Sequence, residues 1–264
     1  MTARTIPEGL ASLLQLLELE QPRVVTASQL EAWSSQAGVT WPGDVVVRRL
    51  RERGWLLDLA TRGAWEFVPA ARAGVFGSGD PLVELRATLA RSPSVAYVAA
   101  AESAAYLLGL ASRRPEREVV GVPEHARSPK AFRGLRIVRW SLRTPPVRRD
   151  GLPIWSQGIL LAFMATRPSG YRDWPNVGEW LIQAVAQMEV DGLKQELTGR
   201  HRGAWARAAY LVDRGGAPEA AHRLLSAAPP GSGPYYLGDR QGKGGRYSRD
   251  FDVIDSIGLE IEGA

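Results

Sequence analysis

The sequence contains no cysteine, only three histidines and only three lysines among its 264 residues. Without cysteine, disulfides, thiolate zinc sites and thiol catalysis are excluded. His125, His201 and His222 are the imidazole groups that remain as ligands or bases, so we expect no metal chemistry and predict no cofactor. The longest apolar run, residues 159–165, is too short to cross a bilayer, and no signal peptide is apparent. We therefore expect a cytoplasmic protein without membrane contact.

Positive charge is abundant, and nearly all of it is arginine. Residues 1–72 hold eight basic and eight acidic side chains, whereas residues 113–149 hold eleven basic and three acidic ones. Such a basic segment can attract phosphates or an acidic protein, but it is equally typical of a solvated face. Arg133, Arg136 and Arg139 are the residues we expect to be exposed on this candidate basic surface, which could contact a protein, RNA or DNA.

The N-terminal sixty residues predict three helices. Leucines spaced three or four residues apart form one face of the first helix, which Pro22 ends. These leucines are Leu10, Leu13, Leu14 and Leu17. Thr26 and Gln29 have the spacing of a capping box, which predicts that a second helix begins there and runs to about Gly38. Pro42 suits the first turn of a third helix, which extends to residue 53.

The third predicted helix has two different faces. Val46 and Leu50 point one way, and the polar residues at 44, 48 and 51 point the other way. After Gly54, apolar residues alternate over 55–59 and again over 65–67, on either side of a tight turn. Two helices joined by a short turn and followed by a hairpin are typical of a winged helix-turn-helix, which inserts its second helix into the DNA major groove.

This geometry predicts which side chains bind DNA. The residues expected to face base edges are Thr40, Trp41, Asp44 and Arg48. Arg49 and Arg51 can reach phosphates, and Arg62 in the turn can reach a flanking phosphate or the minor groove. The zero net charge of this region would also fit a winged helix used only for protein interaction. Four arginines within residues 48–53 favour DNA.

Glycines at positions 74, 77 and 79 interrupt both periodicities and predict a linker over residues 73–81. The predicted division is therefore a DNA-binding domain over 1–72, the linker, and a larger domain over 82–264. In the larger domain we expect strands over 95–99, 119–122, 135–140, 235–237 and 246–254, and helices over 82–89, 102–108, 159–165, 177–188, 190–197, 205–212 and 218–225. The expected fold class is α+β: an N-terminal winged helix followed by a mixed α/β domain.

Several segments, taken in order, resemble the AbiEi family of bacterial antitoxins. They are the winged-helix segment VVVRRLRERGWLLDLATRGAWEF, then SAAYLLGL, an arginine-rich strand pair, a helical region with AWARAAYLV and a final aromatic strand. The best-matching pieces are Gly54-Trp55-Leu56 with Arg62-Gly63, and residues 103–110. The resemblance covers almost the whole chain.

The resemblance implies a two-part protein that is not an enzyme. The winged helix would bind double-stranded DNA in the promoter of its own operon and repress it. The second domain would neutralise a partner toxin of the nucleotidyltransferase type, directly or indirectly. The family has no short motif that assigns toxin-neutralising residues to positions of this sequence.

A nucleotidyltransferase is not indicated. It would need an Asp-x-Asp pair soon after Gly77-Ser78, and the only such pair in the sequence lies far downstream at 250–252.

Two other functions remain open. A nuclease-like enzyme targeted by the winged helix could use Glu124 and Lys130, although no metal-binding aspartate is evident nearby. A protein-interaction module is the other alternative. We find no catalytic constellation in the sequence.

Overall fold

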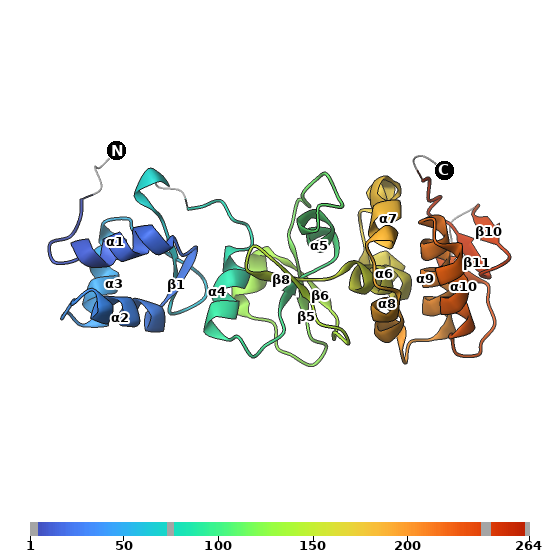
Figure 1. Ribbon diagram of the computed structural model, residues 1–264, viewed down its shortest axis with the longest axis horizontal. Coiled ribbons are helices and arrows are strands. Elements are labelled where there is room, and N and C mark those ends of the chain that lie inside the picture. Colours follow the sequence, from blue (N-terminus) through green and yellow to red (C-terminus); the bar gives the residue numbers. More distant parts are fainter. Residues whose placement is uncertain (1–4, 73–76, 239–243, 262–264) are drawn as a thin grey trace. The chain divides into compact units, whose positions relative to one another are not determined.

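The computed structural model describes residues 5–72, 77–238 and 244–261 (Figure 1). The chain divides into two compact units. The first comprises residues 1–96 and 127–134, and the second comprises residues 97–126 and 135–264. The fold combines helices with three separate sheets, as the expected α+β class requires.

Three helices form the core of the first unit. They are α1 (Ala11–Glu20), α2 (Ala27–Gln36) and α3 (Gly43–Glu52). The predicted capping box is present, because the Thr26 hydroxyl accepts from the Gln29 N–H at 3.3 Å and the Thr26 N–H donates to Gln29 Oε1 at 2.9 Å. Pro42 lies at the N-cap of α3, one position earlier than predicted, and its carbonyl accepts from the amides of Val45 and Val46. The three predicted helices are confirmed.

A three-stranded antiparallel sheet completes this unit. Its strands are β1 (Val24–Thr26), β2 (Leu56–Asp58) and β3 (Ala64–Phe67), in the order β1-β3-β2. The turn between β2 and β3 contains Gly63 at φ 74°, a backbone conformation that favours glycine. The hairpin was predicted, but β1 was not, because three residues directly before a helix are too few to show an alternating pattern.

Helix α4 (Val83–Arg91) also belongs to the first unit. Its Glu84 carboxylate accepts hydrogen bonds from the Ala60 N–H at 2.6 Å and from the N–H and hydroxyl of Thr61 at 3.2 and 2.9 Å. We had predicted that residues from 82 onward form the second domain, but this helix packs on β1 and β3. Residues 73–76 of the predicted linker lie outside the described residues. Two short 3₁₀ segments, η1 (Ala70–Arg72) and η2 (Lys130–Gly134), complete the unit.

The second unit is built on a five-stranded mixed sheet of order β6-β5-β4-β8-β7. The strands are β4 (Val98–Ala99), β5 (Val119–Val122), β6 (Arg136–Arg139), β7 (Val147–Arg149) and β8 (Leu152–Ile154). The β5–β6 and β4–β8 pairs are parallel, and the other two pairs are antiparallel. Strands β4, β5 and β6 fall within predicted segments. The β7–β8 hairpin was not predicted, although its turn is the Asp150-Gly151 pair, with φ of 49° and 74°.

The rest of the second unit is mainly helical. Its helices are α5 (Ala101–Leu107), α6 (Gln157–Thr166), α7 (Val177–Ala186), α8 (Val190–Leu197), α9 (Arg202–Arg214) and α10 (Pro218–Ser226). Helix α9 packs against both α6 and α10, and Figure 1 shows α9 and α10 side by side. A second sheet, of order β10-β11-β9, follows, with strands β9 (Tyr235–Leu237), β10 (Arg246–Ser248) and β11 (Val253–Asp255). Short 3₁₀ segments η3 (Pro168–Gly170) and η4 (Trp174–Asn176) connect α6 to α7. All the predicted helices of this region are present.

An aromatic cluster lies where the sheet meets α6. The ring centroid of Trp140 is 5.5 Å from that of Phe163 and 6.2 Å from that of Trp155, and the Trp155 and Phe163 centroids are 5.0 Å apart. All three side chains are at most 2% exposed. Aromatic pairs at these separations contribute about 0.5–1.5 kcal/mol beyond the area they bury.

A buried carboxylate connects α8 to the segment that follows β6. Glu196 is 0% exposed. Its Oε1 accepts from the amides of Arg143 and Thr144 at 2.7 Å each and from the Thr144 hydroxyl at 2.8 Å, and its Oε2 accepts from Trp140 Nε1 at 3.3 Å. A buried charge is tolerated when its hydrogen bonds are satisfied in this way.

Replacing Glu196 should therefore destabilise the second unit in a graded way. Glu196→Ala removes four acceptor contacts and is expected to lower the free energy of unfolding by about 3 kcal/mol. Glu196→Gln keeps the Oε1 contacts but turns an amide donor toward the indole N–H of Trp140. This variant is expected to lower the free energy of unfolding by about 1 kcal/mol. Urea unfolding followed by tryptophan fluorescence measures both. Glu179→Ala, at an exposed position of α7, is the control, and an equal loss in all three variants would contradict the role of Glu196.

Candidate nucleic-acid interface and arginine-lined pocket

Helix α3 presents a polar face to solvent. Val46 and Leu50 are 0% exposed and fix the inner face of the helix, so the side chains at 44, 48 and 51 point outward. Six of the seven predicted DNA-binding residues are exposed: Thr40, Asp44, Arg48, Arg49, Arg51 and Arg62. The first-turn Asp44 lies at the helix N-terminus, where a negative charge is favourable.

Trp41, the seventh predicted residue, is half-buried. A Cβ placed on Gly9 would lie 3.0 Å from a ring carbon of Trp41, so the indole packs tightly against this glycine. The guanidinium of Arg49 lies 4.2 Å from the centroid of the same ring. This cation–π contact fixes Arg49 near the start of α3.

Arg51 forms an ion pair with Asp58 of β2. Both side chains remain largely accessible, at 45% and 59% exposure, so the pair adds little stability. Arg48 and Arg51 line a shallow groove of about 440 Å³ together with Glu52 and Asp58. A phosphate that approached Arg51 would therefore compete with an acidic side chain.

Two arginines lie at the turn of the β2–β3 hairpin, one in the turn and one on α4. Arg62 in the turn is exposed, as predicted. Arg91, at the end of α4, is also exposed, and its Nη1 atom would lie 3.2 Å from a Cβ built on Gly63. The sequence did not indicate Arg91, because α4 was assigned to the other domain. The bonds from Glu84 to residues 60 and 61 hold this turn in place.

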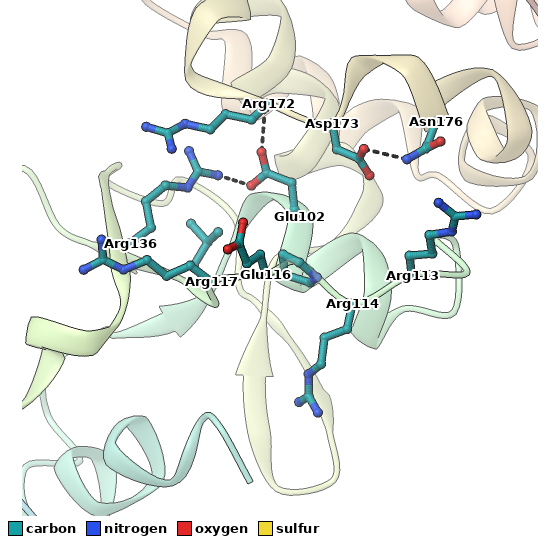
Figure 2. A pocket seen from close by; sticks show the side chains of 11 residues that line it. Glu102, Arg113, Arg114, Glu116, Arg117, Arg136, Arg172, Asp173 and Asn176 are labelled. Atoms are coloured by element: carbon teal, nitrogen blue, oxygen red, sulfur yellow. Dashed lines mark hydrogen bonds and ion pairs between the residues drawn. The ribbon is translucent and has the colours of Figure 1, made fainter. Parts of the chain in front are cut away.

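The second unit contains an arginine-lined pocket of about 350 Å³ (Figure 2). The charged and amide residues that line it are Glu102, Arg113, Arg114, Glu116, Arg117, Arg136, Arg172, Asp173 and Asn176. They come from the start of α5, the segment before β5, strand β6 and the segment that leads into η4. In Figure 2 the side chains of Arg117, Arg136 and Arg172 extend to the same side of the pocket, whereas Arg113 and Arg114 point elsewhere.

Glu102 is the buried carboxylate of this pocket. Its side chain is 7% exposed, forms an ion pair with Arg136 Nη2 and accepts from the Arg172 N–H at 2.6 Å. Arg136 also donates from Nη1 to the Gly170 carbonyl at 2.8 Å. Ala101, just before Glu102, has a φ of 47°, a strained conformation for alanine. The chain therefore accepts backbone strain where it places Glu102.

A second carboxylate lies close by. Glu118 is 5% exposed and accepts from the Ser103 hydroxyl and from Arg114 Nε. Ser103 in turn accepts from the Val119 N–H at 2.7 Å. Arg114 also lies over the Tyr106 ring at 5.4 Å. Arg114 and Arg136 are thus held by buried acids, although Arg114 remains 40% exposed, and Arg113 and Arg172 are exposed as well.

The expected basic surface is only partly exposed. Arg133 lies in η2 and is exposed, as predicted. Arg136 is only 15% exposed because it pairs with Glu102, and the half-buried Arg139 donates to the carbonyls of Pro123 and Ala126. The prediction of exposure is therefore wrong for Arg136 and Arg139, which bind acceptors of their own unit. Of the exposed arginines of the pocket, Arg113 and Arg117 lie earlier in the same basic segment and Arg172 lies beyond it.

Two features are absent from the described residues. They contain no group of three or more histidine, aspartate or glutamate side chains placed to bind one metal ion. None of the helices in this part of the chain has the length and apolar content that a membrane crossing would require.

Comparison with known proteins identifies the second unit. Residues 97–214 match the family model described as the AbiEi antitoxin C-terminal domain. This match, over somewhat less than half of the chain, supports an AbiEi-family antitoxin. The match includes the arginine-lined pocket, and it confirms the resemblance seen in the sequence. The match ends at the last residue of α9, so α10 and the second sheet lie beyond it.

A solved structure is similar to nearly the whole chain. The crystal structure of the RV2827C protein from Mycobacterium tuberculosis matches with a TM-score of 0.78 and 29% identity. The match covers 96% of this chain and 93% of that one, so both units are included. A search of curated proteins finds no match.

A double-mutant cycle on Glu102 and Arg136 tests the geometry of the pocket. Because both side chains are mostly buried, we expect Glu102→Gln and Arg136→Gln each to destabilise the protein and to couple by about 2 kcal/mol. The exposed pair Arg167–Glu124, at 41% and 33% exposure, is the control and should couple by less than about 1 kcal/mol. Equal coupling in the two pairs, measured by urea unfolding, would argue against a buried ion pair.

Proposed function

We propose that the first unit is a winged helix-turn-helix that binds double-stranded DNA, and that the chain represses its own operon through it. The observation that carries this proposal is the exposed polar face of α3 directly followed by the β2–β3 hairpin. In this arrangement α3 enters the major groove and the hairpin turn lies on the backbone. The AbiEi resemblance supports the same function.

The side chains then have distinct roles. Thr40, Asp44 and Arg48 face base edges, while Arg49, held on the Trp41 ring, contacts a phosphate with little loss of side-chain freedom. Arg51 contacts a phosphate once its ion pair with Asp58 has broken.

The hairpin turn supplies the second contact with the backbone. Arg62 and Arg91 both lie at this turn and bind a flanking phosphate together. Arg91 is thus an addition to the residues predicted from the sequence, and it comes from α4.

Removing Arg48 and Arg51 tests the reading face. The double variant Arg48→Ala with Arg51→Ala is expected to lower affinity for the promoter DNA about a hundredfold or more, because two charged contacts are lost. The logarithm of the binding constant should also fall less steeply with the logarithm of the salt concentration, by about one unit per lost phosphate contact. Fluorescence anisotropy over a salt series measures both quantities.

Arg223→Ala with Arg249→Ala is the matched control for charge. Both residues are exposed in the second unit, and their removal should leave the affinity nearly unchanged. Full affinity in the Arg48/Arg51 variant would exclude α3 as the reading helix. Absence of binding by the unaltered protein at low salt would favour the protein-interaction module instead.

We further propose that the second unit neutralises a toxin of the nucleotidyltransferase type, and that the toxin contacts the exposed arginines of the pocket. Support comes from the AbiEi antitoxin domain itself and from Arg113, Arg117 and Arg172, which place positive charge on its accessible surface. Arginine is enriched among the residues that dominate protein interfaces, because it combines charge, planar hydrogen bonding and apolar contact. An acidic side chain of the toxin is the expected partner.

Growth rescue separates the two proposed activities. The full chain is co-expressed with the product of the adjacent open reading frame, because residues 127–134 belong to the first unit and a truncated second domain would keep them without the rest of that unit. The Arg48/Arg51 variant should still restore growth, whereas Arg113→Ala with Arg172→Ala should restore it poorly and bind DNA normally. Full rescue by the pocket variant would reject this contact surface. No rescue by the unaltered chain would reject neutralisation of that product.

A further inference from the structure

Arg207 is a buried cation in the middle of α9. The residue is 8% exposed, and its Nε donates to the Ala165 carbonyl at 2.5 Å, in the last turn of α6. Its Nη1 donates to the Tyr236 carbonyl at 3.3 Å. Both partners are neutral carbonyl groups. Burial lowers the pKa of Arg207 to about 10, which reflects the cost of keeping this charge away from water.

The charge of Arg207 has no counterpart of opposite sign. Among the described residues, no carboxylate lies within ion-pair distance of its guanidinium, and its Nη2 atom has no hydrogen-bond partner. The C-terminal carbonyls of α6 supply only a partial negative charge. Hydrogen bonds to two carbonyls could be made by a neutral donor without the cost of burying a cation. The full charge is therefore more than the packing of α6, α9 and β9 requires.

The guanidinium of Arg207 forms part of the wall of a pocket of about 310 Å³. The polar side chains that line the pocket with it are Ser169, His201, Tyr235 and Tyr236. Gly203 permits this arrangement, because a Cβ there would lie 2.7 Å from the Tyr235 ring and 3.1 Å from His201 Nδ1. Only glycine lets the tyrosine and the histidine approach the start of α9 this closely.

A second pocket, of about 730 Å³, shares His201 with the first. Its charged lining consists of Lys194, Arg200 and Arg202, and no carboxylate lines it. The arginine-lined pocket described above differs in this respect, since Glu102, Glu116 and Asp173 offset its arginines. Burial lowers the pKa of His201, and the positive charges of the neighbouring Arg207 and Arg200 lower it further. Positive charge is therefore in excess around His201, and a bound anion would relieve this excess.

We propose that the Arg207 pocket binds a phosphate group, with Arg207 as its buried charged anchor and Ser169, His201 and Tyr235 as surrounding hydrogen-bond donors. A guanidinium with an unused N–H edge matches a tetrahedral phosphate oxyanion. The phosphate is either inorganic or carried by a nucleotide. In the second case the Tyr235 ring offers a surface for the base, and the adjoining basic pocket receives any further phosphate.

Calorimetric titration of the full chain tests this site with three ligands: inorganic phosphate, a nucleoside monophosphate and the corresponding uncharged nucleoside. Saturable binding of a phosphate-bearing ligand is expected, and the nucleoside should bind far more weakly. Tighter binding of the monophosphate than of inorganic phosphate would identify a nucleotide site, and equal affinity would identify a site for phosphate alone. Absence of saturable binding by both phosphate ligands would overturn the proposal.

Variants then locate the binding. Arg207→Gln is expected to weaken phosphate binding about ten- to a hundredfold, as for a lost hydrogen bond to a charged group. Arg214→Gln is the matched control, because Arg214 lies on the same helix and also donates to a backbone carbonyl, that of Leu259, but does not line the pocket. Since Arg207→Gln could unfold the protein, Ser169→Ala with His201→Gln provides a second test at two exposed residues. Undiminished binding in this second variant, or in a folded Arg207→Gln protein, would reject the site.

Discussion

The buried carboxylate of Glu196 holds the sheet and the helices of the second unit together. It belongs to α8, but its hydrogen-bond donors lie at the end of β6 and in the segment that follows. One of those donors is the indole of Trp140, so the same carboxylate also orients the aromatic cluster on α6. Because a charged group at this depth must satisfy its hydrogen bonds, neither element can shift without the other.

Trp140 transmits this constraint to charged side chains. The guanidinium of Arg200 lies 4.1 Å from its ring and that of Arg167 lies 5.8 Å away. Arg167 is further held by the Arg139 carbonyl at 2.6 Å and by Glu124. Arg167 and Arg200 are therefore held against one indole and have less of the conformational freedom that arginine usually has on a surface.

The buried charges of the second unit fall into two kinds. Glu102, Glu118 and Glu196 are each satisfied by arginine, hydroxyl or amide donors. Arg207 has only carbonyl partners, although it is buried to a similar degree. Since an uncompensated buried charge costs several kcal/mol, a fold keeps it only where something else offsets the cost. This contrast separates structural charge pairs from the site that we assign to phosphate.

Periodicity in the sequence was sufficient for the longer elements. The capping box at Thr26 and the two faces of α3 follow from local spacing, which the structure preserves because these residues contact their neighbours along the chain. The β7–β8 hairpin could also have been found, since Asp-Gly is a strong turn signal. By contrast, the position of α4 depends on Glu84 reaching residues 60 and 61, more than twenty residues away. No local pattern encodes such a contact.

The candidate sites show the same limit. Exposure of Arg48 and Arg62 was predictable, because it follows from helix phase and turn position. The burial of Arg136 was not, since its partner Glu102 is 34 residues away in sequence. Arg207 lay within a segment that carried the family resemblance, yet the spacing of AWARAAYLV indicated only a buried helix. What singles out Arg207 is that, among the residues the structure describes, no acid pairs with it, a property of the tertiary structure alone.

The acidic side chains of the first unit bear on how it would bind DNA under the proposed function. Arg51 must exchange Asp58 for a phosphate, and residues 1–72, which include α3 and the hairpin, have no net charge to attract DNA from a distance. Counterion release then contributes little free energy of binding beyond that of the few direct phosphate contacts. Non-specific DNA binding is therefore weak. The free energy of binding must come from base contacts of α3 and from binding at more than one promoter repeat. Under this proposal the phosphate contact of Arg51 costs an internal ion pair, whereas the base contacts of α3 do not, so a larger share of the binding free energy depends on the DNA sequence.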